Sequence, residues 1–304
     1  MSANGYRIAI TGATGLVGSA LTSTLSDQGS HVVPFRRGTS QPDSPDVFWD
    51  PTEQGICHPE SLGHVDAVVH LAGENIATGR WTVAQKKRIH DSRVNATRNL
   101  VRSLSKLEQP PATFVCASAI GFYGDRGSEE LTETSRPGTG FLSELCRNWE
   151  DAATEAENAG MRVVRVRIGV ILSSQGGALK KMLTPFRLCA GGIVGDGKQY
   201  WSWIGLPDVV GILCEAITNQ DLQGSVNAVS PKPVTNRDFT KILGMVLHRP
   251  TIFPFPAFVA RALLGEMAEE LLLGSTRVIP KVLTELPYEF QHPDLESCLR
   301  YVLR

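Results

Sequence analysis

A glycine-rich string near the N-terminus has the residue types and the context of an anion-binding turn. It follows a short apolar run and opens an amphipathic stretch. In such a turn glycines permit a tight bend, let backbone N–H groups approach a pyrophosphate, and allow a helix to pack closely on a strand. The helix N-terminus adds unpaired donors and a partial positive charge. The alternative is a turn whose glycines serve backbone geometry only. We predict that a dinucleotide binds here, with contacts from Gly12, Thr14, Gly15, Leu16, Val17 and Gly18.

Two arginines after the second apolar run indicate which dinucleotide this is. An NAD site places Asp or Glu about 20 residues beyond the glycines to bind the ribose hydroxyl, whereas a 2′-phosphate calls for arginine. The run here ends in Phe35-Arg36-Arg37-Gly38, without an acidic residue. A guanidinium binds phosphate through a planar fork of donors. We therefore expect NADP(H), bound through Arg36 and Arg37, although two solvated arginines at a strand end would look the same.

The elements that must position these groups alternate between strand and helix. Apolar runs of strand length alternate with longer amphipathic stretches, the pattern of a doubly wound parallel sheet with helices on both faces. We predict helices over 16–28, 83–107 and 141–159, where Gly29, Pro110-Pro111 and Gly160 end them. The predicted strands are 7–11, 31–36, 67–71, 113–117 and 162–168.

The second half of the chain departs from this alternation. Glycines punctuate a loop-rich insertion after residue 172, and a helix over 208–218 and a strand over 225–229 then resume the sheet. The remainder, from residue 250, predicts a compact, mainly helical cap. We expect an α/β fold with a Rossmann-like domain over 1–172, completed by 205–230, and a smaller substrate or cap region over 173–304 that is interleaved with it.

Composition excludes several classes of function. The 304 residues are 42% hydrophobic and carry a formal net charge of −1, so neither nucleic acid nor an acidic membrane surface is an expected partner. The six cysteines are widely spaced, without metal-ligand spacing, and we expect no metal site. No leader-like or membrane-spanning run is evident, so a cytoplasmic location is expected.

Further motifs give the chain a family resemblance. Leu71-Ala72-Gly73 follows a predicted strand, and Asn95-Ala96-Thr97-Arg98-Asn99-Leu100 lies on the next helix. With the glycine turn, these make the chain resemble the extended short-chain dehydrogenase/reductases. The stretches Gly73-Glu74-Asn75-Ile76, Trp149-Glu150 and Trp201-Ser202-Trp203-Ile204 resemble an atypical branch of the epimerase/dehydratase-like proteins, labelled "epimerase family protein", in which a C-terminal domain of unknown function follows.

The resemblance implies a reaction and also shows a departure from it. In the family a tyrosine transfers the proton, a lysine four positions on lowers its pKa, and Ser or Thr polarises the substrate carbonyl. Ser118 matches the serine position, and Tyr123 matches a tyrosine in the following loop that lies near substrate. The helix that carries the pair reads Phe141-Leu142-Ser143-Glu144-Leu145-Cys146, with neither tyrosine nor lysine. We therefore name Ser118 and Tyr123 as the candidate catalytic residues.

Other positions are candidates for binding. The resemblance implies cofactor contacts from Leu71, Ala72, Gly73 and Glu74, and from Ile168 at a strand end. Arg93, just before the helix motif, is a candidate to contact a phosphate or a ribose; the alternative is a solvated helix arginine. Glu74 is an acid or base candidate, or a charge satisfying a helix N-terminus. Trp201 and Trp203 either stack on a ligand or, on one face of a strand, cover the core. For His70 and His90 we expect ordinary structural roles.

Two functions of different classes fit these observations. The first is an NADP(H)-dependent oxidoreductase or epimerase acting on a small hydroxylated or carbonyl compound that resembles a nucleotide sugar. The second is a non-catalytic NADP(H)-binding regulatory or sensor protein that keeps the cofactor pocket without the proton-transfer pair. The sequence does not identify the small-molecule substrate. The family resemblance implies a homodimer.

Overall fold

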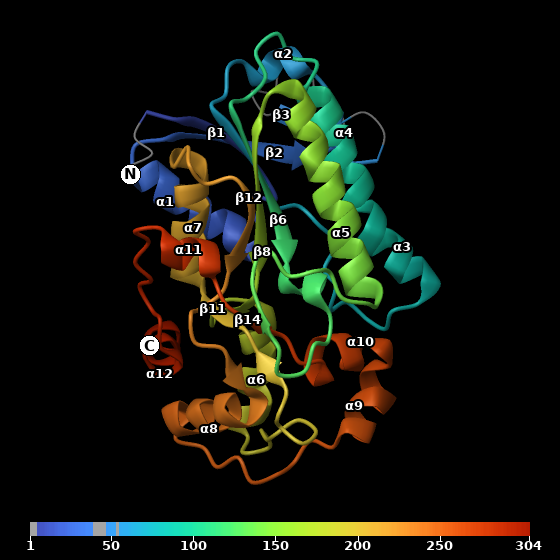
Figure 1. Cartoon of the computed structure of the whole chain (residues 1–304), viewed down its shortest axis with the longest axis vertical. Coiled ribbons are helices and arrows are strands. Elements are labelled where there is room, and N and C mark those ends of the chain that lie inside the picture. The colour runs from blue at the N-terminus through green and yellow to red at the C-terminus, as the bar shows by residue number, and fades with distance from the viewer. Residues whose placement is uncertain (1–4, 39–46, 53–54) are drawn as a thin grey trace.

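The computed structural model describes residues 5–38, 47–52 and 55–304, and its centre is one sheet of eight strands in the order β12-β8-β6-β5-β1-β2-β3-β4 (Figure 1). Every neighbouring pair is parallel except β3 with β4. The strands are β1 (Arg7–Thr11), β2 (His31–Arg37), β3 (Val47–Asp50), β4 (Gly55–Ile56), β5 (Ala67–His70), β6 (Thr113–Ala119), β8 (Arg162–Ile168) and β12 (Gly224–Ala228).

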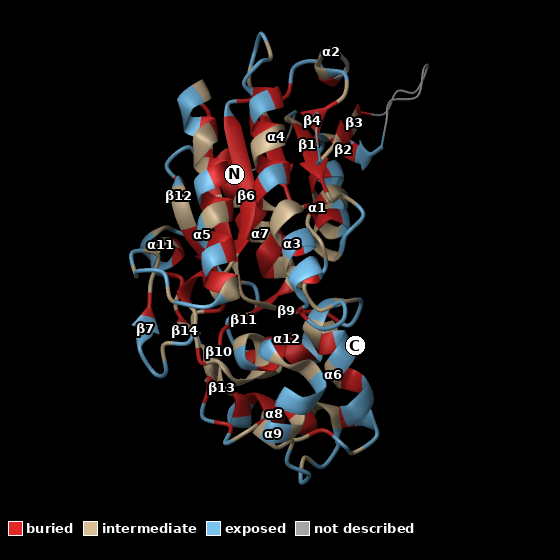
Figure 2. Ribbon diagram, turned by 90° about the vertical axis from the view of Figure 1, so that its right-hand side faces the viewer, coloured by how far each residue is buried: buried red, intermediate tan, exposed pale blue. Residues whose placement is uncertain are grey.

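Helices cover both faces of this sheet, as the alternation in the sequence predicts (Figure 2). Side chains along a strand alternate in direction, so Ile8 and Ile10 face one core and Ala9 the other. The first core includes α1 (Leu16–Asp27) and α7 (Leu206–Thr218), and the second includes α4 (Val94–Leu104) and α5 (Phe141–Thr154). The predicted Rossmann-like, doubly wound sheet is confirmed.

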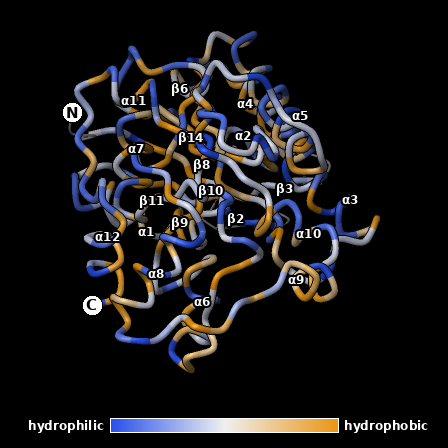
Figure 3. The backbone as a smooth tube through the Cα atoms, turned by 60° about the horizontal axis from the view of Figure 1, so that its bottom comes forward, coloured by the Kyte–Doolittle hydropathy of each residue, from blue (hydrophilic) through white to orange (hydrophobic). Residues whose placement is uncertain are grey.

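The rest of the chain forms a smaller body beyond the carboxyl ends of the strands (Figures 1 and 3). Its core joins the insertion to the C-terminal region, with α6 (Gly177–Arg187), α8 (Asn236–Leu247) and α12 (Leu295–Val302) around Trp201 and Trp203. The other helices of the C-terminal region are α9 (Ala257–Leu264), α10 (Glu266–Ala268), a π-helical turn over Glu269–Leu273 and α11 (Lys281–Glu285). The mainly helical character expected there is confirmed.

Short strands and helices connect these bodies. Three two-stranded sheets pair β9 (Val170–Leu172) with β11 (Trp203–Gly205), β10 (Tyr200–Trp201) with β13 (Val234–Thr235), and β7 (Glu130–Leu131) with β14 (Arg277–Val278). The remaining described helices are α2 (Pro59–Leu62), α3 (Val83–Asp91), a 3-10 turn over Ile120–Tyr123 and another over Glu155–Ala159. Within the described part of the chain, no helix has the length and apolar character needed to cross a membrane.

Several predicted elements are wrong in their limits. The single helix over 83–107 is two, because α3 ends at Asp91 and α4 begins at Val94. The helix over 141–159 is α-helical only to Thr154. Strands β3 and β4 were not predicted, since they are short, and the loop-rich insertion contains α6, which includes Pro185.

Candidate functional site: the carboxyl edge of the sheet

The glycine turn is built so that three segments of backbone meet without side chains between them. Gly12 has φ +71, and a Cβ there would lie 2.9 Å from the nitrogen of Ala72. A Cβ on Gly18 would lie 2.1 Å from the carbonyl oxygen of Gly12. The first glycine therefore permits the bend against the β5 turn, and the last lets α1 pack onto that bend. These roles agree with the pattern that the sequence predicts.

The middle of the turn is open. Gly15 is the N-cap of α1, and no side chain caps the helix there. Thr14 and Gly15 are exposed, while Leu16 and Val17 are partly exposed. The first N–H groups of a helix have no acceptor inside the helix, so α1 presents donors and the positive end of its dipole to a ligand. This arrangement fits the pyrophosphate of a dinucleotide.

The two arginines stand at the same edge of the sheet. Phe35 pairs with Thr11, the residue before the glycine turn, so Arg36 and Arg37 extend one and two residues beyond it. Both side chains are exposed. Two arginines at this strand end contribute a positive field at the edge of the sheet where the 2′-phosphate of NADP is expected.

The turn after β5 is held in place by Thr11, whose hydroxyl contacts the buried His70. Thr11 Oγ1 lies 2.7 Å from His70 Nδ1 and accepts hydrogen bonds from the N–H groups of Leu71 and Ala72 at 3.2 and 3.3 Å. Burial, with smaller contributions from the charges of Arg93 and Arg37, lowers the pKa of His70 to about 3. His70 is therefore neutral and holds the turn, which agrees with the structural role expected of it.

Arg93 lies where the predicted long helix breaks. Its guanidinium packs under Gly73, at which an added Cβ would be 3.1 Å from Cζ. The same group lies over the ring of Trp149 on α5, 5.2 Å from the ring centroid. Burial lowers the pKa of Arg93, and the nearby Cys146 and Glu74 oppose that shift. The structure thus brings Arg93, Gly73 and Glu74 together beyond β5, and their contact with a cofactor stays a prediction.

Ser118 is near the end of β6, but its hydroxyl is already engaged. It is only 4% exposed and donates to Glu150 Oε1 at 2.7 Å. Glu150 forms a two-pronged ion pair with Arg167, through contacts of 2.8 and 2.7 Å. Both charged side chains are almost inaccessible to solvent. The serine therefore belongs to a buried polar cluster, and its catalytic role stays a prediction that this geometry does not support.

Tyr123 occupies the same cluster. The side chain has no exposed surface, its hydroxyl donates to Asn227 Oδ1 at 2.7 Å, and it accepts from Arg167 Nη1 at 2.9 Å. Burial raises the pKa of Tyr123 to about 12, although Arg167 opposes the shift. A phenol so enclosed does not face a ligand, and a proton carrier needs a pKa near the working pH. The geometry therefore gives Tyr123 a structural role.

Arg167 lies at the centre of that cluster, and the sequence analysis did not identify it. The Arg167 guanidinium lies 3.6 Å from the centroid of the Phe122 ring, and Glu150 raises its pKa against the opposing effect of burial. Its partners are Glu150 on α5, Phe122 and Tyr123 in the 3-10 turn, and the carbonyl oxygen of Glu133. Two signals were available in the sequence: an arginine within the apolar strand at 162–168, and the glutamate of the Trp149-Glu150 pair. Neither signal specifies the partner.

Helix α5 contains neither tyrosine nor lysine. Cys146 is buried, and that burial raises the pKa of its thiol to about 12, so it is an inert side chain. At the start of α5, Glu270 from the C-terminal π-helical turn accepts from the N–H groups of Phe141 and Leu142 at 2.8 and 2.7 Å. The C-terminal region therefore holds the helix N-terminus with a carboxylate.

Three further residues named in the sequence analysis lie at the carboxyl edge of the sheet or in the smaller body next to it. Ile168 ends β8, opposite Ala119, and is partly exposed. Trp201 and Trp203 are 8% and 0% exposed and pack in the core of the smaller body. The core interpretation of the two tryptophans is confirmed, because their rings are covered by neighbouring side chains.

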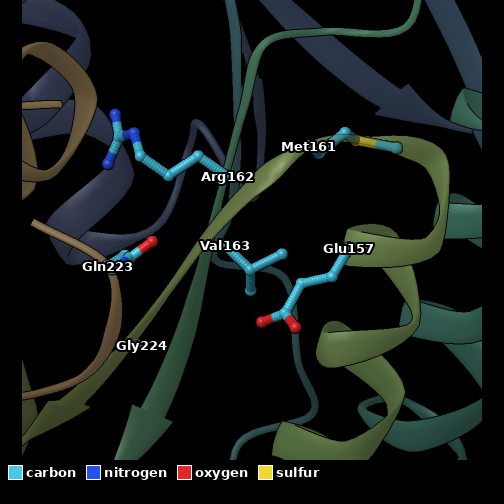
Figure 4. Close-up of a pocket in the computed structure, with 6 residues that line it drawn as sticks. All are labelled: Glu157, Met161, Arg162, Val163, Gln223 and Gly224. Atoms are coloured by element: carbon cyan, nitrogen blue, oxygen red, sulfur yellow. The ribbon is translucent and has the colours of Figure 1, made fainter.

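A surface hollow of about 450 Å³ lies at the opposite edge, where β8 and β12 begin (Figure 4). The side chains of Arg162 and Glu157 extend in different directions there. The Arg162 guanidinium donates to the carbonyl oxygens of Leu222 and Ile217 and to Thr113 Oγ1. The Arg162 guanidinium is thus engaged with groups of the protein itself, and we do not count this hollow as part of the candidate site.

The doubly wound sheet and the glycine turn at its carboxyl edge together define a dinucleotide-binding α/β protein. The NAD dependent epimerase/dehydratase family matches residues 8–229, and a domain of unknown function, DUF1731, matches residues 255–302. The chain belongs to the NAD dependent epimerase/dehydratase family, in the branch whose members are named epimerase family proteins.

Individual relatives extend over nearly the whole chain. Epimerase family protein MT2273 of Mycobacterium tuberculosis is 41% identical over 294 residues, covering 97% of this chain and 96% of that protein. Epimerase family protein YfhF of Bacillus subtilis is 36% identical over 300 residues and 97% of each chain. The crystal structure of human epimerase family protein SDR39U1 with NADPH is similar, with a TM-score of 0.87, 32% identity and coverage of 97% of this chain and 98% of that one.

Proposed function

We propose that this chain binds NADP(H), with the pyrophosphate at the mouth of α1 and the 2′-phosphate on Arg36 and Arg37. The observation that carries the proposal is the register of β1 with β2, which sets both arginines at the sheet edge where the glycine turn begins. The glycine cradle, in which a Cβ at Gly12 or Gly18 would meet backbone, fits a ligand that must approach the main chain closely. The human relative that was crystallised with NADPH supports the same choice of cofactor.

Replacing Arg36 and Arg37 with alanine is expected to weaken NADPH binding by about 1–3 kcal/mol, because charge-assisted hydrogen bonds to the 2′-phosphate are lost. NADH, which lacks that phosphate, should bind almost unchanged. Isothermal titration of both cofactors measures the difference. An equal loss for NADPH and NADH would contradict the assignment of these arginines to the 2′-phosphate.

We further propose that the protein is an oxidoreductase or epimerase that acts on a small hydroxylated or carbonyl compound of nucleotide-sugar type. NADPH, when bound, supplies a hydride, and the residues of this chain bind and orient it. The family to which the chain belongs supports this class. A cytoplasmic location, a small-molecule substrate and a homodimer are parts of this proposal.

One observation favours a second function, a regulatory or sensor protein that binds NADP(H) without turnover. Ser118 and Tyr123 both use their hydroxyls inside the buried cluster, and α5 carries no tyrosine or lysine at the expected positions. Proton transfer by the usual pair is therefore absent. A cofactor pocket without it suits a protein that reports the NADP(H) state to a partner.

Turnover separates the two functions. Purified protein with saturating NADPH is incubated with a panel of carbonyl compounds and nucleotide sugars, and cofactor oxidation and product formation are followed. An enzyme is expected to consume NADPH with at least one of them, and Ser118→Ala is expected to lower that rate. Tight binding of NADPH without consumption across the panel favours the sensor, and an unchanged Ser118→Ala rate argues against the serine.

A further inference from the structure

Arg93 and Glu74 are oppositely charged neighbours that do not bind each other. Within the described chain, neither forms an ion pair, and the Glu74 carboxylate has no hydrogen-bond donor. Among the described residues, the guanidinium donates two hydrogen bonds, both from Nη1, to Ile89 O and Ser92 Oγ at 3.4 Å. The Arg93 side chain is only partly exposed, and holding a cation there with two long hydrogen bonds and no ion pair is costly. A group from outside the chain that accepts from Arg93 would offset that cost.

Neighbouring groups hold the Glu74 backbone and the Arg93 side chain in place. Ser92 Oγ accepts from the N–H of Glu74 at 3.0 Å and donates to the carbonyl oxygen of Ile89. The guanidinium is fixed between Gly73 and the Trp149 ring, and any residue larger than glycine at position 73 would press on it. The break between α3 and α4 directs Arg93 to this position. The pair is therefore a preorganised donor and acceptor beyond the end of β5.

The order of the strands indicates which half of a dinucleotide lies near Arg93 and Glu74. Strand β1 lies between β2 and β5: the chain runs outward from β1 through β2, β3 and β4, and then crosses back to the other side of β1 as β5. A dinucleotide spans such a switch point, so its adenine half lies toward β2 and its nicotinamide half toward β5. Gly12 packs on the backbone of Leu71 and Ala72, and Gly73 packs on Arg93. The pair thus lies on the nicotinamide side of the glycine turn.

We propose that Arg93 and Glu74 clamp the vicinal diol of the nicotinamide ribose, the guanidinium donating to a hydroxyl oxygen and the carboxylate accepting a hydroxyl proton. Each hydroxyl is a donor and an acceptor, so a diol satisfies both unpaired groups at once. This inference rests on the proposed binding of NADP(H). It places ribose recognition on the β5 turn and the start of α4, in a chain whose α5 lacks the polar pair.

The test compares two ligands by isothermal titration. NADPH contains the nicotinamide ribose, whereas adenosine 2′,5′-bisphosphate contains the adenine half and the 2′-phosphate without it. Arg93→Met keeps the stem on Trp149, and Glu74→Gln keeps the shape of the acid. Arg98→Met on α4, whose partly exposed side chain pairs with Glu155, is the matched control. Thermal unfolding checks that each variant is folded.

Each variant of the pair is expected to weaken NADPH binding about tenfold or more and to leave the bisphosphate within about twofold, while the control changes neither. Unchanged NADPH affinity, equal losses for both ligands, or a loss confined to one variant would overturn the clamp. Should Arg93→Met fail to fold, Glu74→Gln alone decides by the same criterion. Wild-type protein that binds neither ligand would instead overturn the proposed function.

Discussion

Gly15→Val is expected to fold normally and to lose at least about 100-fold in NADPH affinity, about 2.7 kcal/mol. Gly15 has φ −74 and ψ 173, which any residue adopts, and an added Cβ would have the carbonyl oxygen of Gly12 as its nearest neighbour at 3.3 Å. The backbone conformation therefore suits valine, and the Gly12 oxygen has to shift by only a few tenths of an ångström. The methyl groups of valine, however, stand at the open mouth of α1, where a pyrophosphate must approach the N–H groups.

The measurement is titration with NADPH beside a thermal unfolding scan. Ser19→Val, on an exposed position of the same helix, is the matched control and should keep its affinity within about twofold. Gly18→Val is not a substitute, because its Cβ would meet the Gly12 oxygen at 2.1 Å and disturb the fold. A folded Gly15→Val protein with wild-type affinity would show that the cofactor binds elsewhere.

Glu150→Gln is expected to destabilise the protein by about 3–5 kcal/mol, because it leaves the Arg167 charge buried without its counterion. The two side chains are 7% and 5% exposed, and the carboxylate also accepts from Ser118. Urea unfolding followed by fluorescence measures the loss. The partly exposed Arg98–Glu155 pair supplies the control, since Glu155→Gln should cost less than about 1 kcal/mol.

The double variant Glu150→Met with Arg167→Met separates a lost ion pair from lost packing. Replacing a buried pair by apolar side chains of similar size removes the stranded charge, so the double variant is expected to be more stable than Glu150→Gln. A double variant less stable than the single one would contradict the account of the cluster. So would a Glu150→Gln protein within about 1 kcal/mol of wild type.

Local patterns in the sequence predict the frame of the molecule well. The limits of β1 and β8 agree with the apolar runs, because both strands are buried and neighbouring glycines or turns bound them. The glycine turn was predictable because each of its glycines serves a local backbone need. The position of Arg36 and Arg37 was also predictable, because neighbouring parallel strands end at the same edge of a sheet.

Contacts across large sequence separations could not be predicted in this way. Ser118 and Glu150 are 32 residues apart, and Glu270 caps a helix that begins 129 residues earlier. No periodicity records such a pairing. The break at Arg93 was also hidden, because the apolar positions of α3 and α4 continue one helical rhythm across it while tertiary contacts with Gly73 and Trp149 set the actual geometry.

The central claim is that main-chain amides at the start of α1 and the guanidiniums beyond β2 recognise NADP(H). Isothermal titration of the purified wild-type chain with NADPH and with NADH tests it most directly. NADPH is predicted to bind at least about tenfold more tightly than NADH, the effect of one or more charge-assisted hydrogen bonds to the 2′-phosphate. No heat of binding with NADPH or NADP⁺, or equal affinity for NADPH and NADH, would contradict it.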